Sequence, residues 1–235
     1  YNARQQLHSN EAFKYRVENK SEALMIKISL CMIVKNEAEV LARCLDSVCD
    51  LMDEIIIVDT GSTDDTKAVA ARYTDQVYNF TWTNDFSAAR NFSFSLANMD
   101  YIYAPDADEV LDEKNRQKFF QLKEALLPEI EIVQMKYHTV SDFNTVLNAK
   151  TEYRPKLFKR LRTFEWIDPI HETIRLTPVV YDSDIEILHM PQSMHHKRDF
   201  SIFLDAFAKE GMFSAKLRSM YAKELFKTGD EKDFS

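Results

Sequence analysis

The chain has 235 residues and a formal net charge of −8, with hydrophobic residues at 45% and charged residues at 29%. This composition is typical of a folded globular protein, and the 3 glycines exclude collagen and multi-glycine phosphate loops. The acidic balance indicates that nucleic acid is not a partner. We expect no transmembrane segment, because the longest apolar runs are strand-sized, although peripheral membrane contact is compatible with the sequence. Three cysteines without a C-x-x-C pair indicate reduced thiols in a cytoplasmic protein.

Residues 1–24 are polar and lack a clear period, so we expect a helical or flexible leader before a main domain over 25–197. In that domain, apolar runs that predict buried strands alternate three times with amphipathic segments that predict helices. Such alternation predicts an α/β fold with a mostly parallel sheet flanked by helices. The expected strands cover 26–34, 55–58, 76–80 and 101–104. The expected helices cover 37–49, 62–72 and 86–98, and a capping box of Ser62 and Asp65 starts the second.

The pattern changes after Leu126. Short apolar segments bounded by turn residues predict a small antiparallel layer. These strands are expected over 129–140, 153–160, 164–167 and 185–188, with a turn at 142–145. From Arg198 the apolar spacing predicts two helices broken at Gly211. They would form a C-terminal helical hairpin over 198–235, of the kind that begins a repeat array.

Carboxylates follow two of the expected parallel strands. Asp59 ends the second strand, and Asp106 and Asp108 follow the fourth. Ligands on parallel sheets bind at the carboxyl ends of the strands. In an extended segment Asp106 and Asp108 point the same way, and two carboxylates suit Mn²⁺ or Mg²⁺ with positions left for phosphate oxygens. The alternative is a solvated acidic loop or a helix N-cap.

The segment Asp59-Thr60-Gly61-Ser62 also matches the aspartic protease signature. That family needs two such loops, so that two carboxylates share a proton, and this chain has one copy followed by an expected helix. Asp59 is better suited to accept a hydrogen bond from the edge of a nucleoside base. A simple helix-capping turn is the alternative.

Basic residues offer two candidate anion sites. Arg90, on the expected helix over 86–98, is placed to face a phosphate, or else is a surface arginine paired with Asp85. Five basic residues over 154–162 would line a phosphate or acceptor groove, or form the solvated face of a strand.

Two residues in the second half are candidates for chemistry. Glu172 follows Trp166, and a carboxylate near an aromatic wall suits a general base. The alternative is that the His171-Glu172 pair is structural. His189 follows the expected strand over 185–188 and is the candidate third metal ligand, with a hydrogen-bonded loop histidine as the alternative. We expect His195 and His196 to be solvated.

Four segments in order resemble glycosyltransferase family 2, the inverting enzymes of GT-A fold. The matching segments are SLCMIVKNE (29–37), DEIIIVDTGSTD (53–64), DFSAARN (85–91) and DADE (106–109). The segment from Trp166 to Glu172 and the terminal helices resemble the branch with C-terminal helical repeats, which includes S-glycosyltransferases that modify glycocin peptides. The resemblance covers about residues 26–190. The chain departs from the family at Pro105, where a branched apolar residue is usual, so we expect a shifted loop there.

The resemblance implies a nucleotide-diphosphate sugar donor, most simply a UDP-sugar, and a divalent cation, Mn²⁺ or Mg²⁺. It places Asp59 on the nucleobase, Asp106 on the ribose or near the metal, and Asp108 on the metal. The residues implied to line the nucleotide pocket are Asn36, Glu37, Asp85 and Arg90. Glu172 falls where the family has its general base, which takes a proton from the acceptor during a single displacement with inversion.

The implied acceptor is a peptide, a lipid-linked glycan or a lipopolysaccharide core. Two other functions stay open. A sugar nucleotidyltransferase usually carries a glycine-rich basic loop after its first strand, where this chain has Lys35-Asn36-Glu37. A non-catalytic nucleotide-sugar binding module would bind a donor without turnover.

Overall fold

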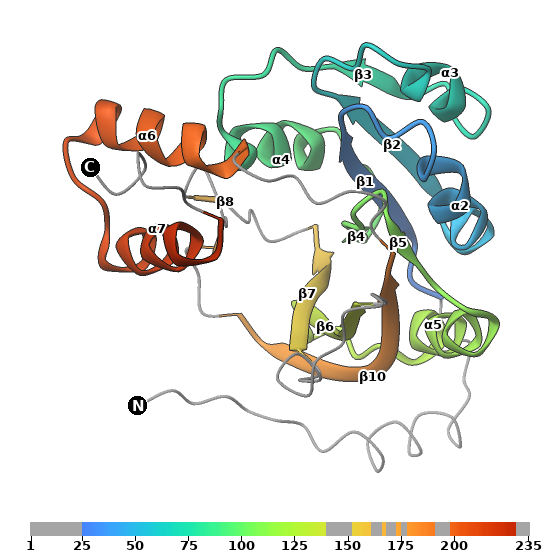
Figure 1. The fold of residues 1–235 in the computed structure, drawn as a ribbon. Helices are drawn as coiled ribbons and strands as arrows, with labels where there is room; N and C mark the ends of the chain where they lie inside the picture. Colours follow the sequence, from blue (N-terminus) through green and yellow to red (C-terminus); the bar gives the residue numbers. More distant parts are fainter. Residues whose placement is uncertain are drawn as a thin grey trace.

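The computed structural model describes residues 25–139, 152–160, 166–167, 173–174, 178–190 and 198–228. Within these residues one twisted eight-stranded sheet carries helices on its faces, and a helical hairpin lies beside α4 (Figure 1). The expected leader over 1–24 and the expected turn at 142–145 lie outside the described residues.

The first half of the sheet is parallel, as the alternating pattern predicted. Strand β1 (Ile28–Val34) lies between β2 (Glu54–Asp59) and β4 (Tyr101–Tyr103), and β3 (Val77–Asn79) pairs with the outer side of β2. Strand β1 is buried along almost its whole length, which explains its near-continuous apolar sequence. The register pairs Val34 with Asp59, so these two strands end together.

Strand β7 (Glu152–Lys159) joins this parallel half to the rest of the sheet. It runs antiparallel to both β4 and β6 (Ile132–Thr139), and the order across the sheet is β3-β2-β1-β4-β7-β6-β10-β5. Strand β10 (Val180–His189) is parallel to β6, and the short β5 (Glu109–Val110) closes the edge. The antiparallel strands thus extend the same sheet. Strands β8 (Trp166–Ile167) and β9 (Thr173–Ile174) pair separately.

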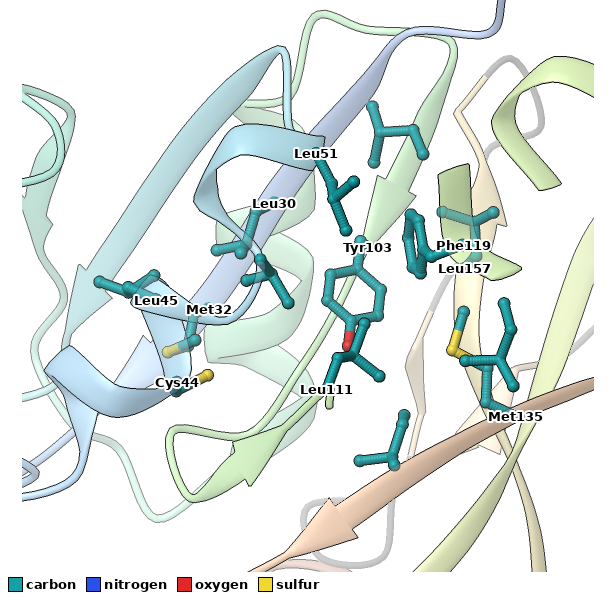
Figure 2. Close-up of a cluster of buried hydrophobic side chains, with 14 of the residues drawn as sticks. Leu30, Met32, Cys44, Leu45, Leu51, Tyr103, Leu111, Phe119, Met135 and Leu157 are labelled. Carbon is teal, nitrogen blue, oxygen red and sulfur yellow. The ribbon is translucent and has the colours of Figure 1, made fainter. Parts of the chain in front are cut away.

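Helices on the two faces bury separate apolar clusters. On one face α2 (Leu41–Asp46) and α5 (Glu113–Ala125) bury Leu45 and Phe119 against β1 and β4, where Tyr103 meets Phe119 edge-on (Figure 2). On the other face α4 (Phe86–Ser95) packs Phe94 against β1, β2 and β7. The remaining short helices are η1 (Cys49–Leu51) and α3 (Thr66–Ala70). Helix α5 was not predicted from the sequence.

The expected helical hairpin is confirmed over the described residues. Helix α6 (Arg198–Glu210) and helix α7 (Ala215–Thr228) are joined at Gly211, whose φ of +72° lies in the left-handed region that glycine adopts without strain. The hairpin buries Phe203 and Leu217 in a third apolar cluster, which includes Trp82 from the loop before α4.

Candidate functional site

The carboxyl ends of six strands, β1, β2, β3, β4, β6 and β10, share one edge of the sheet. Strands β2 and β4 are parallel to β1, and the two successive antiparallel pairings through β7 return β6 and β10 to the same direction. Asp59 ends β2, Asp106 and Asp108 follow β4, and His189 ends β10. The candidate residues of both halves therefore lie along one edge.

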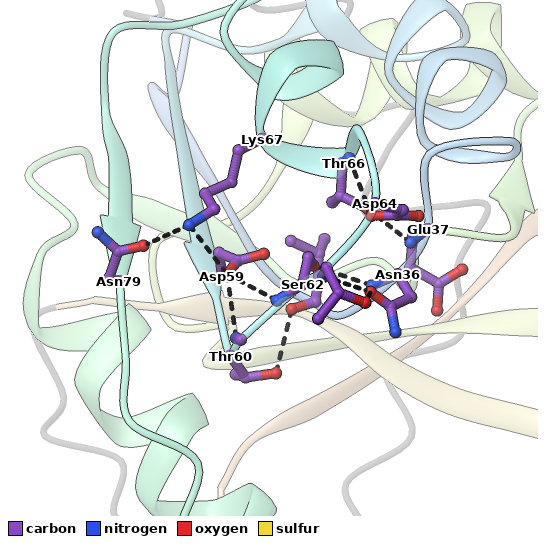
Figure 3. A network of polar contacts seen from close by, with 12 residues as sticks. Asn36, Glu37, Asp59, Thr60, Ser62, Asp64, Thr66, Lys67 and Asn79 are labelled. Carbon is purple, nitrogen blue, oxygen red and sulfur yellow. Dashed lines mark hydrogen bonds and ion pairs between the residues drawn. The ribbon is translucent and has the colours of Figure 1, made fainter.

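Asp59 is a fixed hydrogen-bond acceptor at this edge (Figure 3). Its side chain is 1% exposed, and Oδ1 accepts the N–H groups of Gly61 and Ser62 at 3.0 Å each. Gly61 has a φ of +106°, so the turn that presents these amides requires glycine. Lys67 Nζ lies 3.9 Å from Oδ1 and donates to Asn79. Asp59 Oδ2 is buried and has no hydrogen-bond partner among the described residues.

The loops after β1 and β2 are tied together by their polar groups. Asn36, with φ of +56°, donates its N–H to the Ser62 hydroxyl at 2.9 Å, and its Oδ1 accepts the N–H of Thr63 at 2.8 Å. The N–H of Glu37 donates to Thr66 Oγ1 at 2.7 Å. Asn36 and Glu37 are therefore held beside the Asp59 turn (Figure 3).

The predicted capping box of Ser62 and Asp65 is wrong. Helix α3 begins at Thr66, and Asp65 precedes it without a side-chain cap. The Ser62 hydroxyl instead accepts the N–H of Asn36. Asp64 accepts the N–H groups of Thr66 at 3.0 Å and Ala38 at 3.2 Å. Ser62 thus serves the contact with the loop after β1, and Asp64 serves both that loop and the first residue of α3.

A cluster of charges lies at the loop after β4, with Lys156, Glu109 and Arg90 buried and Asp106 partly exposed. Lys156, from the middle of β7, is buried and places Nζ 2.6 Å from Glu109 and 3.3 Å from Asp106. The N–H of Asp106 donates to Glu109 Oε2 at 3.1 Å, so this carboxylate also shapes the loop backbone. Arg90 is buried on α4 and reaches within 3.9 Å of Asp106 Oδ1.

The pKa values of the two carboxyl groups in this cluster, Glu109 and Asp106, are shifted in opposite directions. Burial raises the pKa of Glu109 to about 7, although the Lys156 cation opposes the rise. Loss of surrounding water opposes the ionisation of Asp106, but the cations of Lys156 and Arg90 outweigh it and hold the pKa of Asp106 well below its ordinary value. Asp106 is therefore a carboxylate at neutral pH.

The side chains of Asp108 and His189 are in contact. Oδ2 of Asp108 lies 2.9 Å from His189 Nε2, and the two side chains are 24% and 23% exposed. The His189 ring stacks on Tyr137 with centroids 5.1 Å apart, and the Arg154 guanidinium lies 3.6 Å above the Tyr137 ring. Asp106 and Asp108 thus have different partners. Within the described residues no group of three His, Cys, Asp or Glu side chains is arranged to hold a metal ion.

Asp85 caps the start of α4, whereas Arg90 lies within the helix and reaches toward Asp106. Asp85 is the N-cap of the helix, and its Oδ1 accepts the N–H of Ala88 at 3.0 Å and the hydroxyl of Ser87 at 2.6 Å. The alternative of a surface arginine paired with Asp85 is wrong, because Arg90 is buried and faces Asp106.

Some candidates lie outside the described residues, and others were missed. Glu172, His195 and His196 are not described. Lys156 and Glu109 were not singled out from the sequence. The interpretation of 154–162 as a solvated strand face is wrong for Lys156, whose place between β4 and β6 follows only from the sheet order. Its position next to the buried Leu157 and Phe158 was the available signal.

Comparison with known proteins places the chain among glycosyltransferases. The model of the family described as glycosyl transferase family 2 matches residues 29–177, more than half of the chain. The chain is 31% identical over 162 residues to the prophage-derived glycosyltransferase SunS of Bacillus subtilis, which is 63% of this chain and 38% of SunS. It is 51% identical over 89 residues to a TPR repeat-containing protein of Synechococcus elongatus, which is 38% of this chain and 22% of that protein. The chain therefore spans well under half the length of these curated relatives.

Solved structures show the same fold. Glucosyl-3-phosphoglycerate synthase from Mycobacterium tuberculosis, in its complex with Mn²⁺, UDP-glucose and phosphoglyceric acid, superimposes with a TM-score of 0.57 at 15% identity. The match covers 81% of this chain and 82% of that one, and at this identity it shows the fold alone. Among the described residues, no helix has both the length and the apolar character needed to cross a membrane. The match over 29–177 and the GT-A arrangement of the sheet lead to one conclusion: the chain belongs to glycosyltransferase family 2.

Proposed function

We propose that this chain transfers a sugar from a UDP-sugar to an acceptor nucleophile, with inversion at the anomeric carbon and with the assistance of a divalent cation. The observation that carries the proposal is the buried Oδ2 of Asp59, an acceptor without a hydrogen-bond partner in the described part of the chain. It lies at the sheet edge that also holds Asp106, Asp108 and His189.

The chemistry of Asp59 favours a base that presents an N–H donor on its edge, such as uracil, over cytosine. An ionised carboxylate only accepts hydrogen bonds, and the N3 atom of uracil is a donor, whereas N3 of cytosine is an acceptor that would face the carboxylate unfavourably. A donated N–H would also remove the cost of a buried, unpaired oxygen, about 1–3 kcal/mol. In this proposal the base approaches Asp59 beside Lys67, whose side chain is 49% exposed and lies 3.9 Å from Oδ1.

The diphosphate end of the site combines oxygen and nitrogen donors with fixed positive charge. Asp108 would hold a Mn²⁺ or Mg²⁺ ion, since a carboxylate oxygen is a donor that such cations prefer, and His189, 2.9 Å away, would add an imidazole nitrogen. When bound, the cation neutralises charge on the departing diphosphate. Arg90 would face a phosphate, and Lys156 keeps Asp106 ionised for the ribose or the edge of the metal site.

The transfer step itself needs a base. In this proposal Glu172 takes the proton of the acceptor nucleophile, which forms a bond to the anomeric carbon as the bond to the diphosphate oxygen breaks. The role of Glu172 rests on the resemblance to the family. Among the expected acceptors, a peptide is favoured by the 31% identity to SunS and by the resemblance to enzymes that modify glycocin peptides. A cytoplasmic setting is consistent with the three free cysteines.

Calorimetry with UDP-, GDP-, CDP- and dTDP-glucose, each with and without Mn²⁺, tests the donor. We expect binding of UDP-glucose that strengthens with Mn²⁺, and little binding of CDP-glucose. Equal affinity for all four donors would contradict the role of Asp59. A transfer assay with a cysteine- and serine-containing peptide library, read by mass spectrometry, tests the acceptor. Binding without transfer to peptides, lipid-linked glycans or lipopolysaccharide core would favour a binding module, and release of pyrophosphate would favour a nucleotidyltransferase.

A further inference from the structure

A polar bridge joins the helical hairpin to the start of α4. Nδ2 of Asn84, in the loop before α4, donates to the Asp205 carboxylate on α6. Oδ1 of the same amide accepts from Trp82 Nε1 at 2.7 Å. The indole N–H can only donate and the carboxylate only accepts, so the orientation of the Asn84 amide is fixed by its two partners.

The backbone at this bridge is in an unusual conformation. Asn84 has a φ of +56°, in the left-handed region that asparagine tolerates better than most residues. Both the oxygen and the nitrogen of its side-chain amide have hydrogen-bond partners, while the backbone turns sharply into Asp85. This arrangement fixes the direction in which the chain enters α4.

Apolar contacts surround the bridge. The rings of Trp82 and Phe86 meet edge-on with centroids 4.8 Å apart, and both pack against the cluster of Ile202, Phe203 and Leu217 from the hairpin. Figure 1 shows α6 lying beside the start of α4. The first residue of α4 is thus held by the hairpin as well as by its own cap.

Helix α4 carries this constraint to the candidate donor site. Asp85 caps the helix through Ala88, and Arg90, just over one turn beyond its first residue, reaches Asp106. A helix is rigid over this distance, so a shift at its first turn moves Arg90 relative to Asp106. The bridge and the site therefore share one rigid element.

We propose that Asp205 is a positioning residue for donor binding, acting through Asn84 and the first turn of α4 on Arg90. The inference rests on the proposed function, because it takes Arg90 to face the donor phosphates. It gives the helical hairpin a part in the donor site, whatever further role the hairpin has toward an acceptor.

The test compares Asp205→Ala, Asp205→Asn and Asn84→Gly with wild type. Asp205→Ala removes the acceptor, Asp205→Asn keeps one through its amide oxygen, and Asn84→Gly removes the bridge while it tolerates a positive φ. The matched control is Glu124→Ala, which removes the same charge from an exposed position on α5. Calorimetry with UDP-glucose and Mn²⁺ gives donor affinity, amide hydrogen exchange over 86–91 reports the order of α4, and thermal unfolding reports overall stability.

We expect Asp205→Ala and Asn84→Gly to raise the Kd for UDP-glucose by roughly threefold to thirtyfold, with faster exchange over 86–91. Asp205→Asn should recover most of the affinity, and Glu124→Ala should behave like wild type. A folded Asp205→Ala protein with wild-type Kd and wild-type exchange would overturn the inference. Reduced thermal stability with an unchanged Kd would do the same, since it marks a purely structural bridge. If wild type binds no nucleotide sugar, the proposed function fails, and unchanged exchange in Asn84→Gly would separately reject the positioning role.

Discussion

Oδ2 of Asp108 lies 2.9 Å from Nε2 of His189, although Asp108 follows β4 and His189 ends β10. Backbone contacts hold these strand ends together, because the N–H of Met190 donates to the Asp108 carbonyl at 3.0 Å and Arg43 Nη2 donates to the Met190 carbonyl at 2.9 Å. The Tyr137 ring also lies against the imidazole, with centroids 5.1 Å apart and a tilt of 32° between the planes. The pair is therefore assembled by the sheet, which lowers the ordering cost of binding a cation there.

The first prediction concerns Asp108. Asp108→Asn removes a charged oxygen from the proposed metal site and should weaken Mn²⁺-assisted binding of UDP-glucose by roughly tenfold to a hundredfold, as expected for loss of a charged partner. Calorimetry in saturating Mn²⁺ measures the change. Binding without metal should change much less. If the variant and wild type bind the donor equally in Mn²⁺, Asp108 is not a metal ligand.

The second prediction concerns His189. His189→Ala should weaken the binding of Mn²⁺ in the presence of UDP, because one of the two paired donors is lost. Electron paramagnetic resonance of free Mn²⁺ measures this directly. The control is His138→Ala, which removes an exposed imidazole from β6. Equal Mn²⁺ affinity of the two variants would mark His189 as a structural residue.

The third prediction separates binding from chemistry. Glu172→Gln keeps the size of the side chain but cannot accept a proton, so turnover should fall by roughly 10²–10⁴-fold with donor affinity little changed. Steady-state transfer and calorimetry measure the two quantities. Full turnover in this variant would move the base elsewhere, with Asp168 the nearest alternative in the sequence. Loss of donor binding would instead assign Glu172 to the donor site.

The fourth prediction concerns the buried Lys156. Lys156→Met leaves two carboxyl groups, Asp106 and Glu109, without their shared cation and should cost about 3–5 kcal/mol of unfolding free energy. Urea unfolding measures the loss. Adding Glu109→Gln to this variant should recover part of the stability, because one uncompensated buried acid is removed. Lys114→Met, at an exposed position on α5, is the control and should have little effect.

The fifth prediction is a pH dependence from Asp53. Burial opposes its ionisation, but Oδ2 accepts from Lys123 Nζ at 2.8 Å and from the N–H of Ile28 at 2.9 Å, and these contacts lower the pKa of Asp53. A lowered folded-state pKa adds stability that is present above the ordinary pKa of aspartate and is lost as the pH falls through the folded value.

Asp53→Asn should therefore be less stable than wild type at pH 7 by about 1–2 kcal/mol, with the difference shrinking below about pH 4. Urea unfolding from pH 7 down to pH 3 checks the sign. A difference that grows toward low pH would contradict the assignment. Asp184→Asn, an exposed aspartate paired with Lys118, is the control for a surface ion pair.

The parallel half of the fold was predictable because a strand that is buried on both faces needs a nearly continuous apolar sequence. Strand β1 is apolar at nearly every position, and α4 alternates its apolar residues with the helical period. Helix α5 escaped prediction because its sequence is mostly charged and polar, with Phe119 and Leu122 among the few apolar residues facing the core. Its N-cap Asp112, which accepts the N–H of Asn115 at 2.8 Å, was the local signal that was overlooked.

The site was predictable only where a motif marks a strand end. Asp59 and Asp106 follow apolar strands, so their shared edge followed from the alternating pattern. Lys156 could not be placed in this way, because its burial depends on β7 entering the middle of the sheet between β4 and β6. The contact between Asn84 and Asp205 depends equally on how the hairpin packs, which no local pattern records.

The central position of β7 has a consequence for how the chain folds as it is synthesised. The four strands from β1 to β4 can pair once residue 103 has emerged, but β4 then presents an open edge until residues 152–159 arrive. Strand β6 has emerged by then, yet it joins this sheet only through β7. An unpaired strand edge is a template for association with other chains. The nascent protein therefore presents this open edge while the stretch between Tyr103 and Glu152 is being made, and β7 ends that interval by pairing with both β4 and β6.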